Sequence, residues 1–218
     1  MIDAISAEVV VIPAGSELLH ADLRIPPRPQ GVVIFAHGSG SSRFSSRNRR
    51  VAESLHIRGF ATVLLDLLTP KEESVDIYTA EFRFDIARLA ARVGAAAVWS
   101  ASQSTLSDLP VGLFGASTGA GAALIAAAEH PELVRAVVSR GGRPDLANHF
   151  LQRVHAPTML IVGGADREVL EMNRQALAEM LCVVQLHVVH GATHLFEEAG
   201  TMEEVERVAG EWFERHLK

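Results

Sequence analysis

Runs of apolar residues alternate with amphipathic stretches along most of the chain. Gly31–Ala36 reads G-V-V-I-F-A, a continuous apolar run that is typical of a strand covered on both faces. Similar runs predict further strands at Ala61–Leu68, Pro110–Phe114, Leu133–Ser139, Thr158–Gly163 and Val183–Val189. Helical patterns lie between these runs, and this alternation predicts an α/β fold with a mostly parallel sheet and helices on both faces.

The longest helical pattern covers Thr79–Ser102, where Phe82, Ile86, Leu89 and Val93 recur at helical spacing. We expect further helices at Arg47–Arg58, Gly119–His130, Asp145–Val154, Arg167–Met180 and Met202–Leu217. The start of the chain differs, because two strand-like runs flank Pro13-Ala14-Gly15-Ser16. These runs, Glu8–Ile12 and Leu18–Ile25, predict an antiparallel hairpin at the edge of the sheet.

Length and composition favour one globular domain over residues 1–218, since the chain has 218 residues, 48% of them hydrophobic and 21% charged. The 26 acidic residues outnumber the 20 basic ones, and the net charge is −6. An acidic chain repels phosphate backbones, so we expect no nucleic-acid partner.

The location expected from the sequence is the cytoplasm. Residues Met1–Ser6 lack the basic start and apolar core of a signal peptide, and no run approaches the length of a membrane span. The one cysteine, Cys182, cannot form an internal disulfide, which is usual in a reducing compartment. We therefore expect no membrane partner.

Polar residues that follow strands are the candidates for chemistry, because ligand sites in parallel sheets lie at the carboxyl ends of strands. Gly115-Ala116-Ser117-Thr118-Gly119 follows a predicted strand and precedes a predicted helix, with the pattern G-x-S-x-G. Such a turn holds the serine in a strained conformation with its Oγ exposed. We predict that Ser117 is a nucleophile; the alternative is that the small residues serve close helix–sheet packing.

A base and an acid follow later strands. Asp166 comes after Thr158–Gly163, and His194 lies in the loop after Val183–Val189. The order Ser117, Asp166, His194 predicts a catalytic triad, in which aspartate orients histidine and histidine activates serine. Asp166 could instead cap a helix, and His190 competes with His194. We favour His194, because it lies deeper in the loop that must reach Ser117.

The loop His37-Gly38-Ser39-Gly40-Ser41-Ser42 follows the strand Gly31–Ala36. A tetrahedral oxyanion needs two donors, and we predict the backbone N–H groups of Thr118 and Ser39. An ordinary flexible turn is the alternative for this loop. Gly38 and Asp66, at the ends of two neighbouring strands, are further candidates for contact with a substrate.

Two basic clusters also lie near strand ends. They comprise Arg43, Arg47, Arg49 and Arg50 after the glycine-rich loop, and Arg140 and Arg143 around Gly141-Gly142. Arginine pairs well with carboxylate or phosphate, so Arg43, Arg140 and Arg143 are candidates for binding an anionic substrate group. The alternative is a solvated surface with salt bridges. Glu72 and Glu73 are interpreted as solvated loop charges.

These motifs resemble the α/β-hydrolase superfamily, and the compact chain is most similar to its dienelactone-hydrolase-like branch. The resemblance covers nearly the whole chain and rests on His37–Gly40, Gly115–Gly119, Gly163–Asp166 with Val169, and Gly191–His194. It implies an eight-stranded sheet whose second strand is antiparallel. It also implies cleavage of small carboxylic esters, or related acyl bonds, through an acyl-enzyme. Dienelactone hydrolase itself carries cysteine as nucleophile, whereas this chain has Ser117.

The segment between Ser139 and Thr158 has room for only one short helix, so we predict no large cap domain and an open site for a small-molecule ester or acyl substrate. We expect neither a metal nor a cofactor. Gly38-Ser39-Gly40 has Arg43 where a dinucleotide fingerprint needs glycine or alanine, and no P-loop is present. A non-catalytic ligand-binding protein of this fold, or an acyltransferase, peptidase or thioesterase with the same triad, remains an alternative. The oligomeric state is left open.

Overall fold

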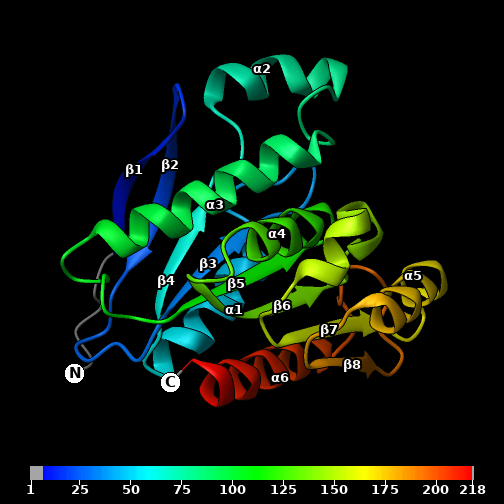
Figure 1. The fold of residues 1–218 in the computed structure, drawn as a ribbon. Helices are drawn as coiled ribbons and strands as arrows, with labels where there is room; N and C mark the ends of the chain where they lie inside the picture. The colour runs from blue at the N-terminus through cyan, green and yellow to red at the C-terminus, as the bar shows by residue number, and fades with distance from the viewer. Residues whose placement is uncertain (1–6, 218) are drawn as a thin grey trace.

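The computed structural model describes residues 7–217 and contains an eight-stranded sheet with the order β1-β2-β4-β3-β5-β6-β7-β8 (Figure 1). The strands are β1 (Glu8–Ala14), β2 (Glu17–Arg24), β3 (Val32–Ala36), β4 (Ala61–Leu65), β5 (Val111–Ala116), β6 (Val134–Arg140), β7 (Thr158–Gly163) and β8 (Val184–Val189). β2 pairs antiparallel with β1 and β4, and every later pairing is parallel. The predicted hairpin and parallel sheet are confirmed. The absence of a signal peptide was predicted from residues 1–6, which lie outside the described residues.

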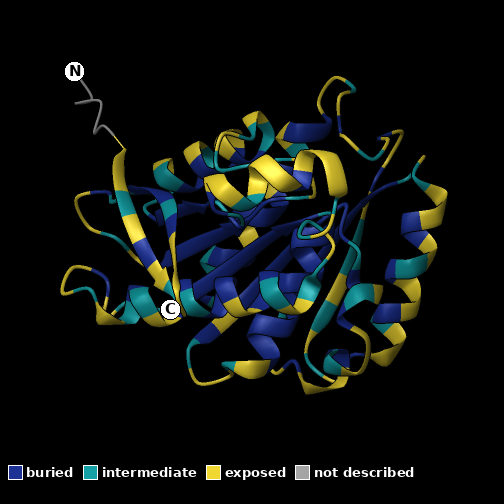
Figure 2. Cartoon of the chain, turned by 90° about the horizontal axis from the view of Figure 1, so that it is seen from above, coloured by how far each residue is buried: buried dark blue, intermediate teal, exposed yellow. Residues whose placement is uncertain are grey.

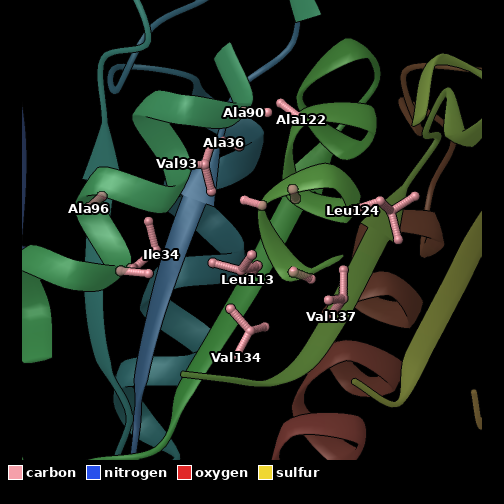
Figure 3. Packing of buried hydrophobic residues seen from close by; sticks show 14 of the residues in the cluster. Ile34, Ala36, Ala90, Val93, Ala96, Leu113, Ala122, Leu124, Val134 and Val137 are labelled. Carbon is pink, nitrogen blue, oxygen red and sulfur yellow. The ribbon is translucent and has the colours of Figure 1, made fainter. Parts of the chain in front are cut away.

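Helices cover both faces of the sheet (Figure 1). Side chains of α1 (Ser46–Ile57) and α6 (Thr201–His216) pack on one face with Phe35 and Phe114. Those of α3 (Ile86–Ser102) and α4 (Thr118–Glu129) pack on the other face with Ile34 and Leu113, as Figure 3 shows. Adjacent residues of one strand point to opposite faces, so Ile34 and Phe35 enter different clusters. Figure 2 shows the buried strands enclosed by helices whose outer surfaces are exposed.

The remaining helices lie near the carboxyl ends of the strands. The 3₁₀ helix η1 (Pro144–Arg153) connects β6 to β7, and α5 (Arg167–Glu179) follows β7. In the described chain no cap domain is inserted between β6 and β7, as predicted. Among residues 7–217, no helix has the length and apolar character that crossing a bilayer requires.

One helix was not predicted. The helix expected from Thr79 begins only at Ile86, and Pro70–Thr79 forms a separate helix, α2, which stands apart from the sheet (Figure 1). Its start is a capping box: Thr69 Oγ1 accepts a hydrogen bond from Glu72 N–H, and the Glu72 carboxylate accepts one from Thr69 N–H. Pro70 occupies the first turn, where its missing N–H is tolerated. The sequence Thr-Pro-Lys-Glu therefore carried a helix-start signal.

The interpretation of Glu72 as a solvated loop charge is wrong. Its side chain is 13% exposed and accepts hydrogen bonds from Arg88 and Arg92 of α3. Burial opposes its ionisation, but the hydrogen bonds from Arg92 and Thr69 outweigh burial and lower the pKa of Glu72 to about 2. Glu72 thus fastens α2 to α3, whereas Glu73 is exposed.

Candidate active site

Ser117 occupies a sharp turn between β5 and α4. The strand ends at Ala116 and the helix begins at Thr118, so Ser117 alone makes the connection, with φ 51° and ψ −123°. This conformation is rare for a residue with a Cβ and is unfavourable by about 1–3 kcal/mol. Close packing enforces it, because a Cβ on Gly119 would lie 2.7 Å from the carbonyl carbon of Ala36.

Backbone hydrogen bonds hold Ser117 against the end of β6. Ser117 N–H donates to the Arg140 carbonyl at 3.2 Å, and the Ser117 carbonyl accepts from Arg143 N–H at 3.1 Å. Both neighbours belong to the Arg140–Arg143 turn. The strained conformation of Ser117 is therefore fixed from two sides, which is the rigidity that its predicted role as a nucleophile requires.

Asp166 and His194 form a pair at the ends of β7 and β8. His194 Nδ1 lies 2.7 Å from Asp166 Oδ2. Asp166 stands at the start of α5, but its side chain makes no cap hydrogen bond in the described part of the chain. His190 is exposed, and among residues 7–217 its side chain has no hydrogen-bond partner. Because a carboxylate accepts, neutral His194 carries its proton on Nδ1 and leaves Nε2 free to accept one.

Gly141 is the common neighbour of Ser117 and His194. A Cβ on Gly141 would lie 3.6 Å from His194 Cε1, and the carbonyl of the preceding Arg140 binds Ser117 N–H. Within the described residues, Ser117 Oγ makes no hydrogen bond to His194. Such bonds are often long before substrate binds. The structure thus joins Asp166 to His194 and places Ser117 beside the same glycine.

The predicted oxyanion donors lie next to the serine. Thr118 N–H, in the first turn of α4, has no acceptor within residues 7–217. Ser39 N–H donates to Thr118 Oγ1 at 2.8 Å, so this donor is occupied in the structure. A Cβ on Gly38 would lie 3.1 Å from Ser117 Cβ, which shows that the loop passes close to the serine.

His37 shapes that loop, a role that the sequence analysis missed. Its Nε2 accepts a hydrogen bond from Leu67 N–H at 3.0 Å, and its Nδ1 donates to the Gly38 carbonyl at 2.9 Å. The amide can only donate, so this arrangement requires the neutral Nδ1–H tautomer. Burial lowers the pKa of His37 and favours this neutral form. The available signal was a histidine that directly follows a buried strand and precedes glycine.

Comparison with known proteins decides the family. The sequence profile of the dienelactone hydrolase family matches residues 19–218. This chain belongs to the dienelactone hydrolase family. A solved dienelactone hydrolase from Anabaena variabilis is 51% identical, with a TM-score of 0.96 over 98% of this chain and 99% of that chain. The family and this relative support hydrolase activity in general.

Other relatives give less information about the activity of this family member. Proteins from two strains of Mycobacterium tuberculosis, each named "Putative phosphoribosyl transferase", are 56% identical over 210 residues. The match covers 96% of this chain but 46% of theirs, so the chain spans about half the length of these curated relatives. Est1E from Butyrivibrio proteoclasticus is 16% identical with a TM-score of 0.78 over 96% and 98% of the two chains, and shares the fold alone.

Two of the arginines predicted to bind the substrate, Arg43 and Arg143, form ion pairs with carboxylates of this dienelactone hydrolase family member. Arg43 forms ion pairs with Asp22 and Asp66, and Asp66 also accepts a hydrogen bond from Arg43 N–H. Arg143 pairs with Asp145 at 2.7 Å. The charges of Arg43, Asp66 and Arg143 are therefore largely compensated within the protein.

Arg140 differs from both. It is 6% exposed, and its guanidinium has no carboxylate partner among residues 7–217. Burial first, and then the charge of Arg47, lower the pKa of Arg140 to about 10. Arg140 therefore remains a cation whose charge is not compensated by a neighbouring carboxylate.

A cavity of about 240 Å³ lies between the loop His37–Ser42 and α2. Leu67, Leu68, Ile77 and Leu89 supply apolar wall, and Asp66, Glu73, Asp76 and Arg83 supply polar groups. Because Gly38 lines the cavity and lies against Ser117, the cavity adjoins this serine. The site thus has a small cover formed by α2, at a place in the chain where no cover was predicted.

Proposed function

We propose that this chain is a serine hydrolase that cleaves small carboxylic esters, or related acyl bonds, through an acyl-enzyme on Ser117. One observation carries the proposal: the Asp166–His194 pair, joined at 2.7 Å, borders the same Gly141 turn that holds the strained Ser117. A nucleophile, a base and an orienting carboxylate at one edge of a sheet are the components of acyl transfer.

In the first half of the reaction, His194 Nε2 takes the proton of Ser117 Oγ as Oγ attacks the carbonyl carbon. The resulting oxyanion accepts hydrogen bonds from Thr118 N–H and Ser39 N–H. Since Ser39 N–H binds Thr118 Oγ1 in the free protein, the Thr118 hydroxyl must release it as the oxyanion forms.

Collapse of the tetrahedral intermediate breaks the ester C–O bond, and the His194 imidazolium gives its proton to the leaving alcohol. Asp166 stabilises this imidazolium and keeps Nε2 directed at the reacting atoms. Water then attacks the acyl-enzyme, with His194 as base, and the carboxylic acid leaves. Ser117 regains its proton from His194, so the cycle needs no other reactant.

We place the acyl group in the cavity under α2. Its volume, about 240 Å³, is below the roughly 300–1,000 Å³ of pockets for drug-sized ligands, which favours a short acyl chain. The apolar walls Leu68 and Ile77 suit the hydrocarbon part, and Gly38, which also lines the cavity, lies against Ser117.

A fluorophosphonate probe and a panel of p-nitrophenyl esters test this function. We expect the probe to add one label, on Ser117 by peptide mass spectrometry, and turnover to fall from acetate and butyrate to octanoate. Ser117→Ala should lose both labelling and about 10⁴–10⁶ of kcat. Ser104→Ala, at an exposed position remote from the site, is the control. A loss below tenfold in Ser117→Ala would exclude this serine as nucleophile.

Other chemistries of the triad are separate outcomes of the same experiment. Labelling of Ser117 without ester turnover, followed by cleavage of a thioester or peptide, would replace the ester assignment. Labelling that fails in the folded wild-type chain would favour a non-catalytic ligand-binding protein.

A further inference from the structure

The amino end of α1 is positively charged and lies beside the proposed active site. The first turn of this helix contains Arg47 and no acidic residue. Ser45 caps Asn48 N–H, but the N–H groups of Ser46 and Arg47 have no acceptor within residues 7–217. Unpaired N–H groups and the helix dipole attract anions at such a position.

A second, independent feature points to the same place. The side chain of Arg140 reaches α1 from the end of β6, where Nη2 donates to Asn48 Oδ1 at 3.3 Å and the guanidinium lies over the Phe196 ring. Arg140 is 6% exposed, and its buried Nε has no hydrogen-bond partner among the residues that the structure describes. In the described chain Nη1 has no acceptor either, but unlike Nε it is not fully enclosed. Arg140 is thus a buried cation with hydrogen-bond donors that no group within residues 7–217 satisfies.

Arg47 adds a second incompletely paired cation. Its Nε is buried and has no hydrogen-bond partner within residues 7–217, and its Nη1 lies 3.7 Å from Glu197, whose side chain is 68% exposed. The nearby arginines of α1 do not share this property, since Arg49 pairs with Asp22 and Arg50 with Glu203 and Glu206. Burying a cation without a counter-charge is unfavourable. Buried arginines without carboxylate partners beside the proposed active site therefore point to a functional role.

We propose that Arg140, Arg47 and the amino end of α1 bind a phosphate group carried by the substrate. This inference rests on the proposed function, because the phosphate belongs to the ester that Ser117 attacks. The location is suitable: the Arg140 carbonyl binds Ser117 N–H, and Phe196 belongs to the loop that carries His194. A group held here lies on the α1 side of the nucleophile, whereas the acyl cavity is bounded by α2 and α3.

Charge and geometry favour phosphate over carboxylate. Two guanidinium groups and a helix amino end face one exposed carboxylate, Glu197, which leaves room for a dianion. Tetrahedral phosphate offers three oxygens, enough for the Arg140 guanidinium, the Arg47 guanidinium and the free N–H groups of α1 together. The substrate class is therefore a short-chain acyl ester of a phosphorylated alcohol.

Paired substrates test this assignment. We compare kcat/KM for the butyryl esters of glycerol 3-phosphate, glycerol and glycolate, at constant ionic strength. The wild-type chain should prefer the phosphate ester over the neutral ester by at least 30-fold, and Arg140→Gln and Arg47→Gln should each reduce this preference at least tenfold. Arg135→Gln, at an exposed position of β6, should retain it. A preference for the glycolate ester, or none, would overturn the phosphate assignment.

Direct binding separates this inference from the proposed function. In Ser117→Ala, millimolar inorganic phosphate should raise Tm by several degrees relative to chloride and acetate at equal ionic strength. The increase should disappear when Arg140→Gln or Arg47→Gln is added to Ser117→Ala. If phosphate raises Tm in this way but the wild-type chain hydrolyses none of the esters, the phosphate site is supported and the serine hydrolase is refuted. Equal Tm in the three salts would refute the site, whatever the esterase assay shows.

Discussion

Glu72 is the residue whose replacement should loosen α2, the helix that walls the cavity. Its carboxylate accepts hydrogen bonds from Arg92 at 2.6 and 2.8 Å, from Arg88 at 3.0 Å, and from Thr69 N–H at 2.8 Å. Arg92 is 6% exposed and also donates to the Leu67 carbonyl at 2.6 Å. Glu72→Gln keeps the shape of the side chain but removes its charge, so buried Arg92 loses its counter-charge.

The lowered pKa of Glu72 sets the magnitude. The pKa of Glu72 is about 2 instead of its usual 4.5, a difference of 4.5 − 2 = 2.5. At about 1.36 kcal/mol per unit this corresponds to about 3.4 kcal/mol. Solvent screens part of the interaction, because Arg88 is 38% exposed, and we therefore expect Glu72→Gln to lose about 2 kcal/mol. A loss of that size lowers Tm by about 4–8 °C in a chain of this length.

The pH dependence of this loss identifies its origin. A carboxyl with a lowered folded-state pKa stabilises the fold fully above about pH 4.5, and this stabilisation disappears as the pH falls toward 2. Urea unfolding should therefore give a difference between wild type and Glu72→Gln of about 2 kcal/mol at pH 7, and less than half of that at pH 3.

The neighbouring exposed Glu73 provides the control, since Glu73→Gln should change the free energy of unfolding by less than about 0.5 kcal/mol. Equal losses for Glu72→Gln at pH 7 and pH 3 would refute the electrostatic explanation. Because α2 walls the cavity, Glu72→Gln should also raise KM for a short ester more than it lowers kcat.

Three further predictions test the site and its support. Asp166→Asn should lower kcat for a short ester by about 10³–10⁴ with little change in KM, since the amide favours the wrong tautomer of His194; unchanged kcat would exclude the triad. Gly119→Ala should prevent stable folding. Gly191→Ala is the control, because its Cβ would meet nothing within 4 Å in the described chain, and it should lower the free energy of unfolding in urea by only about 1 kcal/mol. Similar losses for the two variants would contradict the close packing around Gly119. His37→Gln should reduce the stability that is lost as the pH falls below 6.5. Burial lowers the pKa of His37, so the unfolded chain takes up this proton more readily than the folded chain does; an unchanged loss in urea titrations would contradict this assignment.

The strands were predictable because strands buried on both faces have a simple sequence signature. Thr158–Gly163 was predicted and found with the same bounds as β7, since all of its residues are apolar or small and all are buried. Parallel strands align their carboxyl ends, so Ser117, Asp166 and His194 could be expected at one edge of the sheet. Their catalytic roles remain predictions.

α2 escaped prediction because a tertiary contact overrides the local pattern. Phe82 continues the helical spacing of Ile86 and Leu89, yet its N–H donates to the buried carboxylate of Asp76 in α2. Asp76 binds the N–H and the guanidinium of Arg83 as well, and so fixes residues 82–83 as a turn between α2 and α3. Helical periodicity cannot show that contact, whereas the Thr69–Glu72 capping box was readable from the sequence.

The arginines show most clearly what sequence reasoning leaves undetermined. Arg43 and Arg140 both follow strands, in a chain with a net charge of −6, so either could have found a carboxylate. The tertiary fold decides between them. β2 and the end of β4 bring Asp22 and Asp66 to Arg43, whereas the groups that contact the Arg140 guanidinium are Asn48 and Phe196. Although acidic residues are in excess, the buried Arg140 guanidinium beside the proposed nucleophile has no carboxylate partner in the part of the chain that the structure describes. This difference between Arg43 and Arg140 can be seen only in the folded structure. It is the reason why we expect the charged part of the substrate to bind on the α1 side of Ser117.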